Sequence, residues 1–241
     1  MTTPAHDLCA LIDASPTPFH AAAEVARRLD AAGFSALDER EAWRLKEGDR
    51  RYVVRGGSTI LAFIVGQESP ARAGFRMIGA HTDSPNLRVK PQPDVHKNGY
   101  RQVGVEVYGS PLYSTWLDRD LSIAGRVSLS RGTTTSSKLL RLSRRIARVA
   151  NVAIHLNRGV NKDGLVLNEQ KHLAPLLGVG DKLELKKLVA AELGEDDKDI
   201  LGLDLMLYDT QPSSVGGLDD DLVFAPRLDN LGSCHASISA L

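Results

Sequence analysis

The sequence is poor in cysteine, in long apolar runs and in net charge, and each shortage excludes a class of protein. Cys9 and Cys234 are its two cysteines and form no Cys-x-x-Cys pattern, so neither a disulfide framework nor a zinc knuckle is supported. No apolar run reaches 18 residues, and the N-terminal stretch lacks the basic-then-apolar order of a signal peptide. Thirty Lys and Arg balance 30 Asp and Glu, so no overall field favours nucleic acid or an anionic membrane. These shortages predict a soluble cytoplasmic protein that binds neither nucleic acid nor membrane.

Nucleotide-binding motifs are missing as well. The sequence has neither a Walker loop nor a dinucleotide-binding glycine fingerprint, and it shows no internal repeat. Its composition is that of an ordinary globular protein, with 42% hydrophobic and 25% charged residues among 241. A chain of this length and composition can bury a core for one large domain or two smaller ones.

The first elements along the chain predict a helix followed by a hairpin. Residues 17–33 favour a helix, because Thr17 can cap it, Pro18 suits its first turn and Gly33 can end it. Residues 50–66 contain two apolar, β-branched runs on either side of a glycine pair, which is typical of a β-hairpin.

The next apolar run, FRMIGAH at residues 75–81, predicts a short buried strand that ends at His81. A polar residue leaving a buried strand indicates an α/β layer with its functional site at a strand end. From residue 92 to residue 223 the pattern changes to Gly- and Pro-punctuated apolar runs, which predict a separate β-rich unit. Within it, residues 138–151 predict a helix with leucines on one face and arginines on the other.

His81 and Asp83 are the first candidates for chemistry. An imidazole at a strand end can offer a neutral nitrogen to a divalent metal, and a carboxylate two residues on can fix its tautomer. On spacing alone, a hydrogen-bonded loop histidine capped by Asp83 or Ser84 is the stronger alternative.

Asp229, in the stretch PRLDNL, is a third candidate, with a helix N-cap as its alternative role. Asp229 and His81 are far apart in the sequence. They can form a joint site only if the chain returns to the same domain after it has built the β-rich unit. His155, in VAIHLNRG, is by itself typical of a satisfied structural histidine. Cys234 and His235 are neighbours that point in different directions on a helix, which argues against a thiol–imidazole nucleophile.

Six segments, taken in order, resemble the M18 family of metallo-aminopeptidases, the aspartyl aminopeptidases. The resemblance runs from about residue 10 to the last residue, and HTDSP and RLDN are its most specific parts. The segments are DASPTPFHAA, GAHTDSPNLRVKP, STWLDRDLSIAGRV, NVAIHLNRG, LMLYDTQPSSVGG and APRLDNLGSCHA.

The resemblance implies an α/β fold and a metal-dependent activity. A two-metal aminopeptidase catalytic domain, formed by residues 1–91 and a second part starting at 224–241, would be interrupted by a β-rich dimerisation domain at 92–223. The implied reaction releases N-terminal residues, acidic Asp or Glu, from peptides through a metal-activated water. The implied cofactors are two zinc ions per complete site, with manganese or cobalt as alternatives, and the implied assembly is a homo-oligomer built from dimers. Arg88 and Lys90 could select acidic termini or could be surface or domain-joining residues, and the sequence leaves both roles open.

The resemblance also assigns roles to single residues. His81 would bind one metal ion, Asp83 would be the catalytic acid behind it, and Asp229 would bridge both ions. His155 would reach from the dimerisation domain into the neighbouring subunit's site to bind substrate. Related two-metal peptidases also imply a cis peptide bond between Asp229 and Asn230.

The chain departs from the family's pattern at its end. That pattern continues with an adjacent Glu-Glu pair, a further acidic ligand and a histidine, whereas here no two glutamates are adjacent and no carboxylate side chain follows Asp229. We therefore expect a chain that is truncated at its C-terminus and weak or inactive alone. The alternative is a non-catalytic oligomerisation subunit that still lends His155 to a complete partner. A non-peptidase amidohydrolase is a third reading, and the HTDSP and AIHLNR segments disfavour it.

Overall fold

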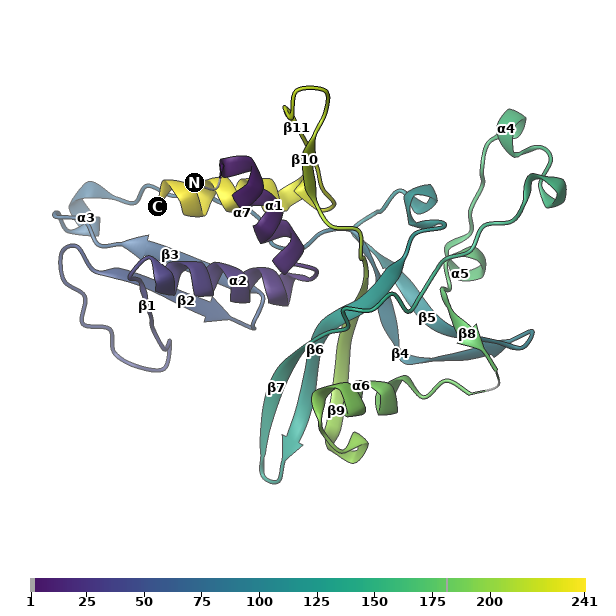
Figure 1. Ribbon diagram of the computed structural model, residues 1–241. Coiled ribbons are helices and arrows are strands. Elements are labelled where there is room, and N and C mark those ends of the chain that lie inside the picture. Colours follow the sequence, from purple (N-terminus) through teal and green to yellow (C-terminus); the bar gives the residue numbers. More distant parts are fainter. Residues whose placement is uncertain (1–2, 181) are drawn as a thin grey trace. The chain divides into compact units, whose positions relative to one another are not determined.

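The computed structural model describes residues 3–180 and 182–241, and the chain divides into two compact units (Figure 1). Unit 1 comprises Met1–Ser84 and Pro212–Leu241, and unit 2 comprises Pro85–Gln211. The chain thus leaves unit 1, builds unit 2 and returns, which is the excursion that a joint site of His81 and Asp229 requires. The divisions fall seven and twelve residues earlier than the boundaries at 92 and 223 read from the sequence.

Unit 1 places helices beside a small three-stranded sheet of order β1-β2-β3, and a separate two-stranded ribbon projects from it (Figure 1). Strand β1 pairs with β2 in parallel, and β2 pairs with β3 antiparallel. The elements of unit 1 are α1 (Pro4–Ala14), α2 (Pro18–Ala31), β1 (Ser35–Ala36), β2 (Arg50–Arg55), β3 (Thr59–Ile64), α3 (Pro70–Ala73), β10 (Ser214–Gly216), β11 (Leu222–Phe224) and α7 (Leu228–Ala240).

Local sequence signals explain why α2 and the β2–β3 hairpin form. The Thr17 hydroxyl accepts a hydrogen bond from the backbone N–H of His20, and Pro18 occupies the first helical turn. Gly33, just past the helix end, has a φ of 83°, a conformation that glycine adopts without strain. The predicted helix and hairpin are therefore confirmed.

The core of unit 1 joins α1, α2, β2 and α7. Side chains from all four elements are buried together, so α7 packs on the N-terminal helices although it comes from the far end of the chain. The cluster contains Leu11, Ile12, Ala21, Val25, Leu29, Phe34, Tyr52, Leu231 and Cys234.

Unit 2 is built around a six-stranded antiparallel sheet of order β7-β6-β9-β4-β5-β8. Its strands are β4 (Asn86–Lys97), β5 (Tyr100–Tyr108), β6 (Leu121–Arg131), β7 (Thr134–Arg141), β8 (Leu176–Val179) and β9 (Ile200–Asp209). Its helical elements are η1 (Tyr113–Trp116), η2 (Ile154–Leu156), α4 (Val160–Asp163), α5 (Glu169–His172), α6 (Leu185–Leu193) and η3 (Asp197–Asp199).

A run of aliphatic side chains fills the core of unit 2. Leucine, valine and isoleucine residues from β4, β5, β6, β9 and α6 are nearly all inaccessible to solvent, and they form one continuous cluster. Close approach inside the sheet depends on Gly125, because a Cβ there would lie 2.1 Å from the carbonyl oxygen of Asp204. The predicted β-rich character of this part of the chain is present in the structure.

Strand β4 begins before the boundary at residue 92 that the sequence suggested. Pro91 and Pro93 read as a linker, yet they lie within β4, where the pairing register with β5 shifts between Val89 and Asp94. Proline is tolerated at such an irregularity because no ladder hydrogen bond is lost. Beyond it, Asn98 and Gly99 form the hairpin turn with φ values of 54° and 76°.

Two predicted elements are wrong. Residues 75–81 form no strand, and Phe75, Met77 and Ile78 are 76%, 86% and 71% exposed. The expected helix at 138–151 is replaced by β7 up to Arg141 and an irregular segment after it, because the residues of β7 pair with β6 along its whole length.

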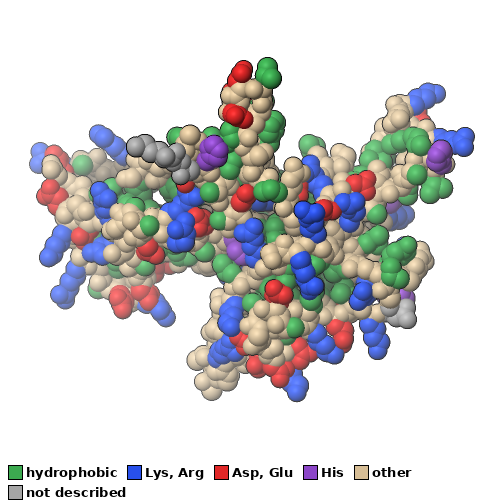
Figure 2. Space-filling model, in the orientation of Figure 1, with side chains coloured by type: hydrophobic (Ala, Val, Ile, Leu, Met, Phe, Trp, Pro, Cys, Tyr) green, Lys and Arg blue, Asp and Glu red, His purple; other side chains and the backbone are tan. Residues whose placement is uncertain are grey.

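The surface agrees with the balanced charge of the sequence. Figure 2 shows acidic and basic side chains interspersed over the face in view. No helix among the described residues is both long and apolar enough to span a lipid bilayer.

Candidate metal centre

Three of the four predicted site residues meet in unit 1. His81 and Asp83 lie on the irregular segment between α3 and β4, and Asp229 lies in the first turn of α7. That turn is not regular helix, since Asp229 and Asn230 have non-helical backbone angles and α7 continues beyond them. The Asp229–Asn230 peptide bond is cis, which confirms the prediction.

The contacts of the His81 ring define the tautomer of its neutral form. Nδ1 lies 2.9 Å from the backbone carbonyl oxygen of Asp83 and 3.3 Å from the Oδ1 atom of the same residue. A carbonyl oxygen can only accept a hydrogen bond, so Nδ1 must carry a proton. In the neutral ring, Nε2 is then the atom with a free lone pair, which is the form that binds metals.

The Nε2 lone pair faces a second electron-rich atom. Asp229 Oδ1 lies 3.1 Å from His81 Nε2, and both side chains are largely open to solvent. Two acceptors at this distance repel unless a proton or a metal ion lies between them. The separation lets both atoms contact one zinc ion at its usual ligand distances of about 2.0–2.2 Å. The donor types, one imidazole and one carboxylate, fit zinc.

The number of donors is smaller than a zinc site needs. No group of three or more His, Cys, Asp or Glu side chains able to hold a metal is found among the residues that the structure describes. Catalytic zinc takes three protein ligands as a rule, so His81 and Asp229 supply only part of a set.

Helix α7 also holds the backbone of His81 on both sides, and the sequence did not reveal these contacts. The His81 N–H donates to Asn230 Oδ1 at 3.3 Å, and Cys234 Sγ donates to the His81 carbonyl oxygen at 3.2 Å. Ser84 Oγ donates to the carbonyl oxygen of Asp229 at 3.1 Å. Burial raises the pKa of the Cys234 thiol, which keeps this donor protonated. The position of Asn230 directly after Asp229 in RLDN was the sequence signal that could have indicated its contact with His81.

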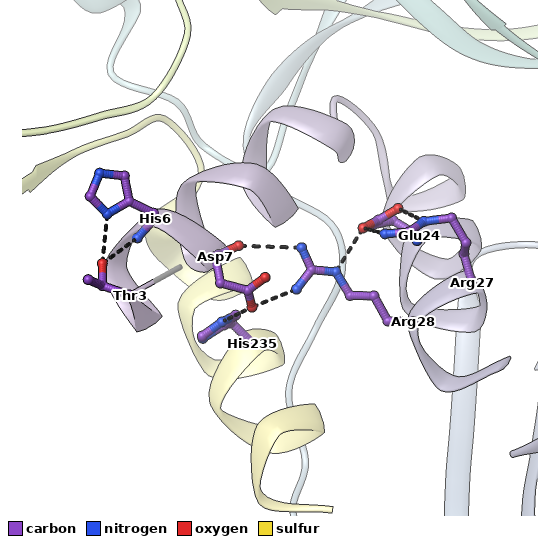
Figure 3. A network of polar contacts seen from close by, with 7 residues as sticks. All are labelled: Thr3, His6, Asp7, Glu24, Arg27, Arg28 and His235. Atoms are coloured by element: carbon purple, nitrogen blue, oxygen red, sulfur yellow. Dashed lines mark hydrogen bonds and ion pairs between the residues drawn. The ribbon is translucent and has the colours of Figure 1, made fainter. Parts of the chain in front are cut away.

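A network of charged residues ties α7 to the N-terminal helices (Figure 3). His235 Nε2 on α7 lies 2.8 Å from Asp7 Oδ2 on α1, and Arg28 Nη1 on α2 donates to the same oxygen at 2.8 Å. Arg28 Nε also donates to Glu24 at 2.7 Å. Burial raises the pKa of Asp7, but the hydrogen bonds from His235 and Arg28 outweigh it, so this pKa lies below its usual value. Cys234 and His235 thus serve different partners, as their adjacency predicted.

The remaining candidates lie in unit 2. His155 is an exposed residue of η2, on the irregular stretch between β7 and β8. Arg88 Nη2 donates to Asp204 at 2.6 Å, and Lys90 Nζ pairs with Glu106 at 3.0 Å. Both cations therefore have partners within unit 2.

The comparison with known families now decides what this arrangement belongs to. The family described as aminopeptidase I zinc metalloprotease (M18) matches residues 11–241. The chain belongs to the M18 family. The match includes the HTDSP and RLDN segments that place His81 and Asp229 side by side.

Curated M18 relatives are similar to nearly the whole chain. "Probable M18 family aminopeptidase 2" of Pseudomonas aeruginosa (strain LESB58) is 47% identical over 237 residues, covering 95% of this chain and 55% of its own length. The Streptomyces coelicolor protein of the same name is 47% identical over 238 residues, covering 98% of this chain and 54% of its own. The chain therefore spans about half the length of these M18 relatives.

Solved structures agree with the fold. A chain in the cryo-EM structure of the Ape4 and Nbr1 complex is 34% identical with a TM-score of 0.93, covering 98% of this chain and 50% of that one. Chaetomium thermophilum mApe1 is 34% identical with a TM-score of 0.85, covering 95% of this chain and 56% of that one. The α/β fold expected from the M18 resemblance is confirmed.

Proposed function

We propose that this chain provides the first part of a zinc-dependent aminopeptidase site, with His81 and Asp229 as metal ligands. The observation that carries the proposal is the facing of the Nε2 lone pair and the Asp229 carboxylate at 3.1 Å. A proton between the two atoms would make them a hydrogen-bonded ion pair, whereas a metal ion would turn them into two ligands. Manganese or cobalt could replace zinc, since both accept imidazole and carboxylate donors.

Asp83 acts on the metal ligand. Its backbone and side-chain oxygens both face Nδ1 of His81, at 2.9 and 3.3 Å, and thereby hold the proton on that nitrogen. This keeps the Nε2 lone pair available to a metal ion. Asn230 and Cys234 fix the backbone of His81, so the ring is oriented from two sides.

Zinc in a complete site of this kind supplies Lewis-acid chemistry, polarising the scissile carbonyl and making water a nucleophile near neutral pH. The substrates are peptides with a free amino terminus, and the first residue released is acidic. A complete site would hold two ions, with Asp229 among their ligands. This chain contributes two of the ligands and holds their orientation.

His155 serves a neighbouring copy in this proposal. It stands on an exposed stretch whose apolar side chains Leu156 and Val166 are largely uncovered. An imidazole on such a stretch can enter another subunit's site and bind substrate there. A solved S. cerevisiae mApe1, 26% identical, is a dodecamer, which supports a homo-oligomer.

The experiment is a peptidase assay of the purified chain on peptides beginning with Asp, Glu or Leu. Zinc, manganese or cobalt is added, and a chelator is the control. We expect little or no release from this chain alone, because its donors are too few. The M18 relative from Pseudomonas aeruginosa, assayed in parallel, should release Asp and Glu faster than Leu. Robust release of N-terminal residues by the chain alone, if chelator abolishes it, would contradict the proposal that the site is incomplete.

The independent core of unit 2 supports a second candidate function, that of an oligomerisation subunit. Its sheet buries a continuous aliphatic core, and the exposed His155 stretch belongs to it. Native mass spectrometry of the chain mixed with a full-length M18 relative tests this function. Hybrid oligomers support it, and strictly separate species contradict it.

A further inference from the structure

Arg227 has a backbone conformation that its residue type seldom adopts. Its φ and ψ are 57° and 26°, in the left-handed region, and it lies just ahead of Asp229 in the RLDN segment. The other described non-glycine residues with positive φ have short polar side chains: Asn98, Ser110, Asp118 and Asp220. Such side chains can hydrogen-bond to the local backbone in this region, which the long arginine side chain does not do as readily. A conformation of this kind persists where surrounding contacts hold it, and it points to a functional constraint.

The guanidinium group of Arg227 is bound to the C-terminal end of α1. Its Nη2 donates to the carbonyl oxygen of Ile12 at 3.1 Å, and Ile12 is inaccessible to solvent. The last carbonyl groups of a helix have no partner within the helix and carry partial negative charge, so a cationic donor suits them. Because Ile12 belongs to the core of unit 1, the Arg227 side chain is attached to a well-packed part of the protein.

The backbone of Arg227 is attached to α7 at the same time. Its carbonyl oxygen accepts a hydrogen bond from the Leu231 N–H at 3.2 Å, and the Leu231 side chain is buried in the same core. Asp229 lies between these two residues, and its own side chain is 86% exposed. Because solvent surrounds most of this carboxylate, its direction is set mainly by the backbone on either side of it.

We propose that Arg227 is a positioning residue for Asp229. Its guanidinium group, bound to α1, holds the left-handed backbone from which the Asp229 carboxylate turns toward His81 Nε2. Residues that orient a ligand without touching the metal are a general part of metal sites. Asp229 is a metal ligand only under the proposed function, on which this role rests, whereas the 3.1 Å contact between Asp229 and His81 does not depend on a metal.

Ser213 offers a control at the same end of α1. Its hydroxyl donates to Asp13 Oδ1 at 2.7 Å, and its backbone N–H donates to the same atom at 2.9 Å. Asp13 is next to Ile12, but Ser213 leads into β10 and not into Asp229. Removing the serine hydroxyl or the guanidinium therefore takes a hydrogen bond from the same helix end, and only the second change should disturb Asp229.

The experiment compares Arg227→Met, Arg227→Lys and Ser213→Ala in the whole chain. The first readout, taken in chelator at one fixed pH, is the NMR chemical shift of the His81 Nε2 nitrogen, which depends on whether a carboxylate faces it. Asp229→Asn gives the reference shift for a lost carboxylate. We expect Arg227→Met to move the signal toward this reference and Ser213→Ala to leave it in place. Arg227→Lys should restore it in part, because lysine keeps a cationic donor without the planar fork of arginine.

The second readout is zinc affinity, measured by calorimetry. The Kd of Arg227→Met should be weaker than that of wild type by about tenfold or more, with Arg227→Lys between them and Ser213→Ala equal to wild type. Thermal unfolding checks that each variant is folded at the temperature of the measurements. If Arg227→Met does not fold, Arg227→Gln takes its place with the same expected results.

An unchanged His81 signal in Arg227→Met would overturn the positioning role. An equal change in Ser213→Ala would also overturn it, because any loosening of the end of α1 would then disturb Asp229. Zinc binding that survives His81→Ala would contradict the proposed function, and the His81 signal recorded in chelator would still decide the role of Arg227.

Discussion

The two units differ in the size of their buried apolar cores. The sheet of unit 2 covers an aliphatic cluster in which Leu121, Ile123 and Leu205 are inaccessible to solvent. Unit 1 has a smaller cluster and leaves Phe75 and Met77 in solvent, on the segment that carries His81. Both candidate metal ligands therefore lie in the unit with the smaller core, and His81 directly follows a segment whose apolar side chains are exposed.

The largest effect should come from the core of unit 2. Leu205 and Leu201 both lie on β9, but Leu205 is fully buried and Leu201 is 59% exposed. Leu205→Ala should lower the free energy of unfolding by about 3 kcal/mol, and Leu201→Ala by less than about 0.5 kcal/mol. Trp116 packs against this core, so its fluorescence during urea unfolding in a Trp43→Phe background reports on unit 2. An equal loss of unfolding free energy in the two variants would show that the core of unit 2 is not well packed.

A smaller loss should follow when unit 1 loses its charged network. Asp7→Asn removes the carboxylate that His235 and Arg28 share. Because the Asp7 side chain is 45% exposed, solvent screening limits the expected cost to about 1 kcal/mol. The control is Glu41→Gln, on an exposed loop of the same unit. Thermal unfolding followed by Trp43 fluorescence measures both, and an unchanged midpoint for Asp7→Asn would mean that the Asp7 carboxylate does not help to hold α7.

Acid should weaken unit 2 through Glu195. The Arg131 and Lys138 side chains lower the pKa of Glu195 from 4.5 to about 2. A carboxyl whose pKa is lower in the folded state stabilises the fold above pH 4.5, and this contribution is lost as the pH falls toward 2. Glu195→Gln should flatten the stability profile in this window, whereas Glu192→Gln, on the exposed side of α6, should not. Identical profiles for wild type and Glu195→Gln would refute the ion pair.

The smallest effect should come from the uncovered segment itself. Met77→Lys should change the stability of the chain alone by less than about 0.5 kcal/mol, because the side chain is 86% exposed. Urea unfolding measures this change. A loss comparable to that of Leu205→Ala would mean that Met77 is buried in solution.

The sequence predicted the elements that depend on local signals. Thr17 and Pro18 begin α2, and the glycine pair at 56–57 turns the β2–β3 hairpin, as expected. The neighbourhood of His81 and Asp229 could be predicted only through the M18 resemblance, because their sequence separation carries no information about distance.

The elements that the sequence did not predict correctly depend on contacts with residues far away in the chain. Residues 75–81 have the pattern of a buried strand, but a strand needs a neighbour, and no described strand pairs with them. Residues 138–141 carry a helical spacing that pairing with β6 overrides. The contact between His235 and Asp7 joins opposite ends of the chain, so no motif could indicate it.

Zinc titration of the purified chain by calorimetry tests the central claim most directly. If His81 and Asp229 are two ligands of an incomplete site, the chain should bind zinc with a Kd weaker than about 1 μM, and His81→Ala and Asp229→Ala should each abolish that binding. His172→Ala, an exposed histidine of unit 2, should leave it unchanged. Nanomolar binding by the chain alone, or binding that survives His81→Ala, would contradict the account.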